Sequence, residues 1–197
     1  MKRLSEKLAN YIVQMDAVSK ESYAVYQYGF QIGLEMVCCF IACFCISLYL
    51  QMVPEFLVFT VIFMLLRTYA GGLHLDSFSA CFICSVIVQT IALLVNAHIQ
   101  FSLIIAWLIL IICSCLIIKM ASASNCDREL DEEEKTYFHK TTKRIIVGIW
   151  IFSAICTMLQ KHETISLIAL TVIIVLGSQY IGKIKYCIQN RILGCWP

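Results

Sequence analysis

Two residues seven positions apart, His74 and Cys81, are the side chains in this sequence best suited to chemistry. A cysteine becomes a nucleophile near neutral pH when its thiolate is stabilised and an imidazole can hold the displaced proton. In a continuous helix the two side chains would share one face but lie about 10 Å apart along the axis, which is too far for proton transfer. The chain must therefore bend between them if they act together.

The residues around this pair favour such a bend. Gly71 and Gly72 permit unusual backbone angles just before the histidine, and Asp76 and the serines after it are good N-caps for a following helix. Cys81 is then expected in the first turn of that helix, where the macrodipole favours a thiolate and unpaired backbone N–H groups can receive an oxyanion. Asp76 could also orient His74 in a triad, so both roles stay open.

A metal site is the competing chemical interpretation of the same segment. His74, Cys81 and Cys84 are of ligand type, and Cys-x-x-Cys spacing recurs in zinc sites. The segment offers no evident fourth ligand and no second pair, and Cys84 is more simply an apolar packing residue. We therefore expect neither a metal nor another cofactor.

The composition indicates what kind of protein must position these groups. Of the 197 residues, 60% are hydrophobic and 14% are charged, and the mean hydropathy is +0.83. Soluble domains are typically about 45–50% apolar and about 25% charged. These values exclude soluble, disordered and nucleic-acid-binding proteins and leave an integral membrane protein. Most of the 12 cysteines fall within apolar runs, where cysteine packs as a small hydrophobe and forms no disulfide framework.

Apolar runs predict an all-α integral membrane protein with about six transmembrane helices in a single domain, residues 1–197. An amphipathic helix within residues 1–30 precedes the spans and is expected to lie in the lipid–water interface. The second and fifth runs are short, and Pro54 suits a tight hairpin between the first two. The six expected spans are Met36–Met52, Val53–Leu66, Ala80–Ala97, Phe101–Met120, Ile145–Leu159 and Ile165–Gly182.

The placement of basic residues predicts the orientation in the cell membrane. Of the 15 Lys and Arg residues, all except Lys161 fall on one side of the six-span arrangement. The positive-inside rule then makes both termini cytoplasmic, together with a catalytic loop at 67–79 and a polar loop at 121–144. The polar loop is acidic and then basic, a pattern typical of a solvated loop at the membrane border and also suited to a charged partner.

The motif in this chain resembles that of the AgrB family, the accessory gene regulator B proteins. The resemblance rests on the six spans, the amphipathic amino terminus and the pattern Arg67…Gly71-Gly72-x-His74-x6-Cys81, with Glu35 as a further match. It implies a membrane cysteine endopeptidase of peptide quorum sensing, with Cys81 as the nucleophile and His74 as its base.

The resemblance also implies a substrate, an AgrD-like propeptide with an amphipathic leader, a short core and a charged carboxyl tail. Cys81 would attack the carbonyl that joins core to tail, release the tail and hold the core as a thioester. A Cys or Ser of the core would then displace Cys81 and close a thiolactone or lactone ring. Restricted access of water at the membrane border would protect the thioester from hydrolysis.

Glu35 and Arg67 match charged positions that matter in the family. They are expected near the cytoplasmic ends of adjacent antiparallel helices, either as an ion pair or as independent interfacial charges. The leader of the substrate is expected beside the amino-terminal helix. The residues expected to meet its tail are Lys135, Lys140, Lys143 and Arg144.

The alternative function is that of a non-enzymatic multi-pass transporter or partner-binding membrane subunit. His74 and Cys81 would then only line a polar entrance. Activation of the thiol distinguishes the two hypotheses, because only the peptidase needs a thiolate. No single helix face indicates whether the chain forms a homodimer, and the sequence reveals neither the propeptide nor its cyclising residue.

Overall fold

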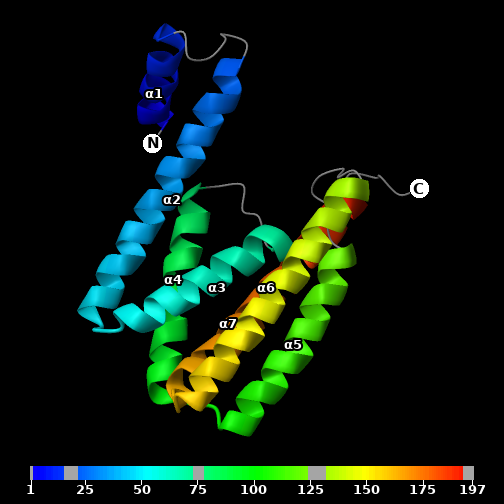
Figure 1. Ribbon diagram of the computed structural model, residues 1–197. Helices are drawn as coiled ribbons and strands as arrows, with labels where there is room; N and C mark the ends of the chain where they lie inside the picture. Colours follow the sequence, from blue (N-terminus) through cyan, green and yellow to red (C-terminus); the bar gives the residue numbers. More distant parts are fainter. Residues whose placement is uncertain (1, 16–21, 73–77, 124–131, 193–197) are drawn as a thin grey trace. The chain divides into compact units, whose positions relative to one another are not determined.

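The computed structural model describes residues 2–15, 22–72, 78–123 and 132–192. Within these ranges the chain is built of seven α-helices, and six of them are long and apolar enough to cross a membrane (Figure 1). This confirms the predicted all-helical membrane fold. The helices are α1 Lys2–Gln14, α2 Tyr23–Tyr49, α3 Val53–Ala70, α4 Phe78–His98, α5 Leu103–Ala123, α6 Glu132–Met158 and α7 His162–Ile192.

Several helices extend beyond the apolar runs that predicted them. Helix α2 begins at Tyr23 where the sequence indicated Met36, and α6 begins at Glu132 where it indicated Ile145. The 27 residues of α2 and the 31 of α7 span about 40 and 46 Å at 1.5 Å per residue, against about 30 Å of hydrocarbon. Apolar composition marks only the part of a helix that lies in lipid, so it underestimates helices that continue outside.

The two loops expected on the basic side are shorter for the same reason. Helix α3 continues through Ala70 and α4 begins at Phe78, so part of the expected loop 67–79 is helical. Likewise, Glu132 to Arg144 of the expected polar loop 121–144 belong to α6. Acidic residues at the start of α6 suit the positive end of the helix dipole.

The chain divides into two compact units, of which the first comprises Met1–Gln51 and Leu75–Val88. In this unit α1 packs along α2, and Ser5 and Ala9 of α1 are fully buried. The apolar side chains of Leu4, Tyr11 and Met15 stay exposed. Helix α1 thus has small residues against its neighbour and an apolar stripe free to meet lipid, as expected of the amphipathic amino terminus.

The second unit comprises Met52–His74 and Gln89–Pro197, and α3, α5, α6 and α7 form its core. Helix α7 contacts the other three, and half of its apolar stretch is buried, a larger share than in any other span. Two indole N–H groups join α5 to α6: Trp150 donates to the hydroxyl of Ser114 at 3.2 Å, and Trp107 donates to that of Thr157 at 3.2 Å. Helix α7 is therefore the element against which the ends of α3 and α6 are placed.

Candidate functional site

Cys81 lies at the position that the sequence predicts, in the first turn of α4. The helix begins at Phe78, so Cys81 is its fourth residue, and its side chain is half-buried. Backbone N–H groups of a first helical turn have no partner within the helix. Cys84, one turn further along α4, is exposed and lacks this setting. Of these two nearby thiols, only that of Cys81 therefore lies in the first turn of α4.

His74 and Asp76 lie outside the described residues, and so do their side-chain contacts. The role of His74 as the base and that of Asp76 as a cap or orienting group therefore stay predictions. What the structure does describe is the backbone that leads to them, from the end of α3 through Gly72.

The two glycines at the end of α3 are needed for different reasons. Gly71 has φ 83° and ψ 176°, a region of backbone space that is essentially restricted to glycine. A Cβ at Gly72 would lie 3.2 Å from the hydroxyl oxygen of Ser178 and 3.5 Å from Cγ of Arg67. The predicted unusual backbone angle is confirmed at Gly71, while Gly72 allows close approach to α7.

A residue that the sequence analysis missed, Gln179 of α7, holds the same turn. Its side-chain amide nitrogen donates a hydrogen bond of 2.6 Å to the backbone carbonyl of Ala70, the last residue of α3. Gln179 is only 2% exposed, and its Oε1 has no hydrogen-bond partner among the described residues. A lone amide in a membrane-spanning run was a signal that could have drawn attention to it.

Arg67 lies in the last turn of α3, near the end of its span as expected, whereas Glu35 lies in the interior of α2. Along its own helix, Glu35 is about 21 Å from Tyr49, and Arg67 is about 21 Å from Val53, at 1.5 Å per residue. Glu35 accepts a hydrogen bond of 3.1 Å from the amide nitrogen of Gln31.

The guanidinium of Arg67 lies 5.8 Å from the centre of the Phe63 ring, within cation–π range. Glu35 belongs to the first unit and Arg67 to the second, so their ion pair stays a prediction.

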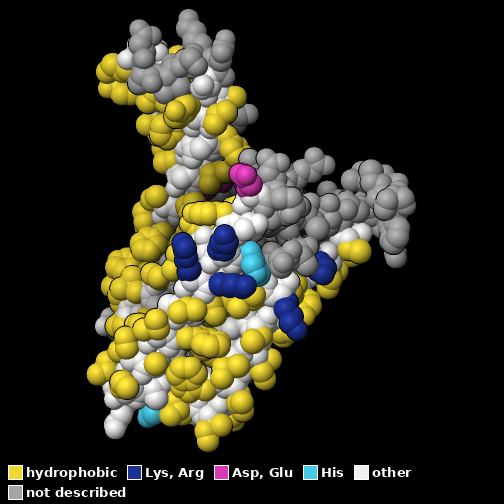
Figure 2. Space-filling view, turned by 45° about the vertical axis from the view of Figure 1, so that its right-hand side comes forward, with side chains coloured by type: hydrophobic (Ala, Val, Ile, Leu, Met, Phe, Trp, Pro, Cys, Tyr) yellow, Lys and Arg dark blue, Asp and Glu magenta, His cyan; other side chains and the backbone are white. Residues whose placement is uncertain are grey.

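The basic residues expected to meet a substrate tail lie between the fourth and the thirteenth residue of α6. Lys140, Lys143 and Arg144 are exposed, whereas the side chain of Lys135 lies outside the description. Figure 2 shows Lys and Arg side chains gathered on one part of the surface, next to a broad apolar face. A cationic patch beside an apolar surface is suited to an anionic, membrane-bound partner.

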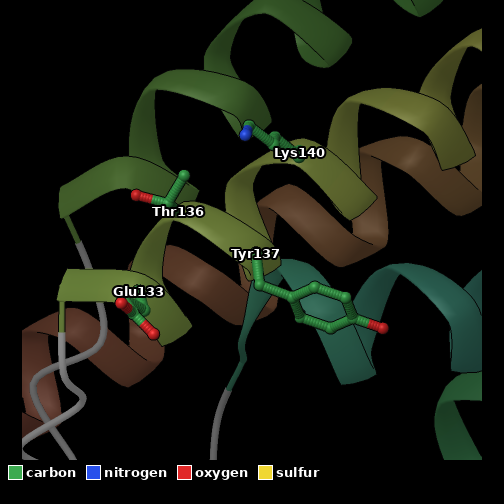
Figure 3. A pocket seen from close by; sticks show the side chains of 4 residues that line it. All are labelled: Glu133, Thr136, Tyr137 and Lys140. Atoms are coloured by element: carbon green, nitrogen blue, oxygen red, sulfur yellow. The ribbon is translucent and has the colours of Figure 1, made fainter.

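An open hollow of about 430 Å³ adjoins these cations (Figure 3). It is lined by Glu133, Thr136, Tyr137 and Lys140, and the Tyr137 ring extends away from Glu133 and Thr136.

Aromatic rings connect this hollow to the end of α3. The Tyr137 ring lies 6.0 Å from that of Phe138, edge to face, and the Phe138 ring lies 6.0 Å from that of Tyr69. Tyr69 precedes Gly71 by two residues. The hollow and the glycine turn therefore belong to the same end of the second unit.

Among the described residues, no three His, Cys, Asp or Glu side chains gather closely enough to hold a metal ion.

The comparisons with known proteins point to one family. No curated protein and no solved structure matches the chain. A sequence profile of one family, described as Accessory gene regulator B, matches residues 5–181. These residues include all six candidate spans over most of their length, the glycine turn and Cys81. The chain therefore belongs to the accessory gene regulator B family.

Proposed function

We propose that this protein is a membrane cysteine endopeptidase that removes the charged carboxyl tail from a small signal propeptide, with Cys81 as the nucleophile. Family membership makes the chain a membrane protein of quorum-sensing peptide processing in the accessory gene regulator system. The observation that carries the finer proposal is the position of Cys81 in the first turn of α4, just after the glycine turn that ends α3.

The reaction begins with attack of the Cys81 sulfur on the carbonyl carbon between core and tail. His74 takes the thiol proton and returns it to the leaving amine, so that the C–N bond breaks as the C–S bond persists. Backbone N–H groups in the first turn of α4, which have no partner within the helix, stabilise the oxyanion of the tetrahedral intermediate. The products are the free tail and a thioester between the core and Cys81.

Ring closure regenerates the enzyme. A thiol or hydroxyl within the core gives its proton to His74 and attacks the thioester carbonyl, so that the new C–S or C–O bond closes the ring. Cys81 leaves as a thiolate and regains that proton from His74. Exchange of one thiol for another is close to balanced in bond energy. Exclusion of water keeps hydrolysis slower than this intramolecular attack.

Substrate binding is assigned to two described surfaces. The exposed apolar stripe of α1 can pack beside an amphipathic leader in the interface. The exposed Lys140, Lys143 and Arg144 can attract an anionic tail, with the Tyr137 hollow beside them. The aromatic contacts to Tyr69 bring that tail near the glycine turn.

Thiol reactivity tests the proposal without a substrate. The protein in liposomes is treated with iodoacetamide from pH 5 to 9, and each cysteine is read by mass spectrometry in wild type and His74→Ala. Free cysteine titrates near pH 8.5, so we expect Cys81 alone to react quickly at pH 6–7 and to lose this advantage in the variant. Cys187 is the internal control, since it is exposed near the end of α7 and lies beyond the candidate span His162–Lys185. Equal rates at Cys81 and Cys187 would favour the transporter or binding subunit.

A further inference from the structure

The backbone carbonyl of Ala70, the last residue of α3, is capped by a side chain of another helix. The last four carbonyls of a helix have no partner within it, and they are commonly satisfied by N–H groups of a following left-handed turn. Gly71 instead has φ 83° and ψ 176°, so the chain leaves the helix in an extended path. The carbonyl of Ala70, which is 3% exposed, receives its hydrogen bond from Gln179 across 109 residues of sequence.

Gln179 is an unfavourable choice for packing alone. Neighbouring inward positions of α7 hold Val172 and Val175, both essentially buried in the apolar core. An amide in the same environment loses its hydration, and its Oε1 has no partner among the described residues. A methionine or leucine would fill the space without that loss. Among the described residues, the hydrogen bond that the Gln179 side chain makes is the 2.6 Å bond to the carbonyl of Ala70.

The adjacent residue of α7 contacts the same turn. The hydroxyl oxygen of Ser178 lies 3.2 Å from the place of a Cβ on Gly72, so the backbone at Gly72 is close against α7. Two consecutive residues of α7 thus contact this turn. Gln179 does so by a hydrogen bond to Ala70, and Ser178 by close packing against Gly72. Only two residues separate Gly71 from His74, and the direction of the chain at this point limits where the histidine can go.

We propose that Gln179 is a positioning residue for the catalytic loop: its amide holds the Ala70 end of α3 on α7 and so sets the path by which the chain reaches His74. This inference rests on the proposed function of His74 and Cys81. Gln179 itself touches no reacting atom and acts through the backbone. Loss of its hydrogen bond leaves the loop in a mixture of paths, of which only some deliver the imidazole to the thiol.

The test compares variants of the full-length protein in liposomes. Gln179→Met keeps the approximate length and volume of the side chain but cannot donate a hydrogen bond. Asn96→Leu is the matched control, because Asn96 is also a buried amide on a spanning helix, is 3% exposed and has an Oδ1 without a partner among the described residues. Two readouts are taken: hydrogen exchange of the amides from Gly71 onward, and the pH dependence of Cys81 alkylation by iodoacetamide.

We expect Gln179→Met to speed exchange in the loop and to slow Cys81 alkylation at pH 6.5 by about three- to tenfold, the range that a single net hydrogen bond supports. The profile of Cys81 should move toward that of His74→Ala. Asn96→Leu should leave both readouts at the wild-type level. If Gln179→Met and Asn96→Leu gave the same Cys81 profile, the positioning role would be refuted even where His74→Ala slows alkylation. If His74→Ala had no effect on Cys81, the proposed function itself would fail, and the positioning role with it.

A second variant separates the hydrogen bond from packing and guards against misfolding of the first. Gln179→Glu is nearly isosteric, and its carboxyl can donate to the Ala70 carbonyl only while protonated. The donor is therefore present at low pH, where the carboxyl is protonated, and is lost at the pH where the carboxyl ionises. The alkylation rate relative to wild type should therefore fall with rising pH in Gln179→Glu and stay low throughout in Gln179→Met. A Gln179→Glu protein whose Cys81 alkylation is as slow as that of Gln179→Met even at pH 5 would overturn the proposal.

Discussion

Replacement of Gly71 by alanine tests whether the catalytic loop depends on the backbone path at the end of α3. At φ 83° and ψ 176° an L residue is strained by about 1–3 kcal/mol. None of the described residues has a heavy atom within 4 Å of a Cβ placed on Gly71, so this cost is that of the backbone. A free-energy difference of about 1.4 kcal/mol corresponds to a tenfold change in an equilibrium constant.

This strain can appear in two ways. If the native path survives, the folded state carries the strain, and a loss of about 2 kcal/mol lowers Tm by about 4–8 °C in a chain of this size. If the loop instead relaxes to another path, stability recovers but the histidine is displaced, and Cys81 alkylation at pH 6.5 falls about fivefold or more. At least one of these readouts must change.

The assay pairs thermal unfolding in detergent with alkylation of Cys81 in liposomes. Gly148→Ala is the control, because Gly148 lies within α6 and a Cβ there would have no heavy atom of the described residues within 4 Å, the helix's own nearby backbone aside. Alanine there adds no contact and suits a helix slightly better than glycine. A Gly71→Ala protein with wild-type Tm and wild-type Cys81 reactivity would refute the requirement for a glycine-only backbone path.

Three further predictions concern the other residues of the site. Gly72→Ala should slow Cys81 alkylation several-fold because its Cβ meets the Ser178 hydroxyl, and added Ser178→Ala should restore much of the loss; a double variant no better than the single would exclude this contact as the cause. Deletion of residues 2–14 should reduce propeptide processing without changing Cys81 alkylation, since α1 is assigned to the substrate leader; equal processing would contradict that assignment. Glu35→Arg and Arg67→Glu should each impair processing, and the double swap should recover part of it if the two form an ion pair; no recovery beyond the single variants would argue against the pair.

Residues close together in sequence account for much of the candidate site. The prediction that Cys81 falls in the first turn of a helix is confirmed, because a helix start depends on local caps and on the run that follows. The unusual angle predicted at the glycines is confirmed at Gly71, because glycine adopts a positive φ readily whatever its neighbours are. The catalytic roles of Cys81 and His74 stay predictions.

Helix ends were the least accurate part of the prediction. The start of α2 at Tyr23 and that of α6 at Glu132 lie well before the apolar runs. Hydropathy reports which residues prefer lipid, whereas helix length depends on backbone hydrogen bonds that continue into the interface. Glu35 consequently lies inside a continuous helix and not before one.

The sequence by itself determined that this chain crosses the membrane about six times and presents Cys81 at a helix start, because hydropathy and local capping act over a few residues or one span. Only the tertiary structure decided which residues of α7 contact the end of α3. Gln179 reaches Ala70, and Ser178 reaches Gly72, from more than a hundred residues away. No local pattern encodes these contacts, since they depend on which faces of α3 and α7 pack together and at what register.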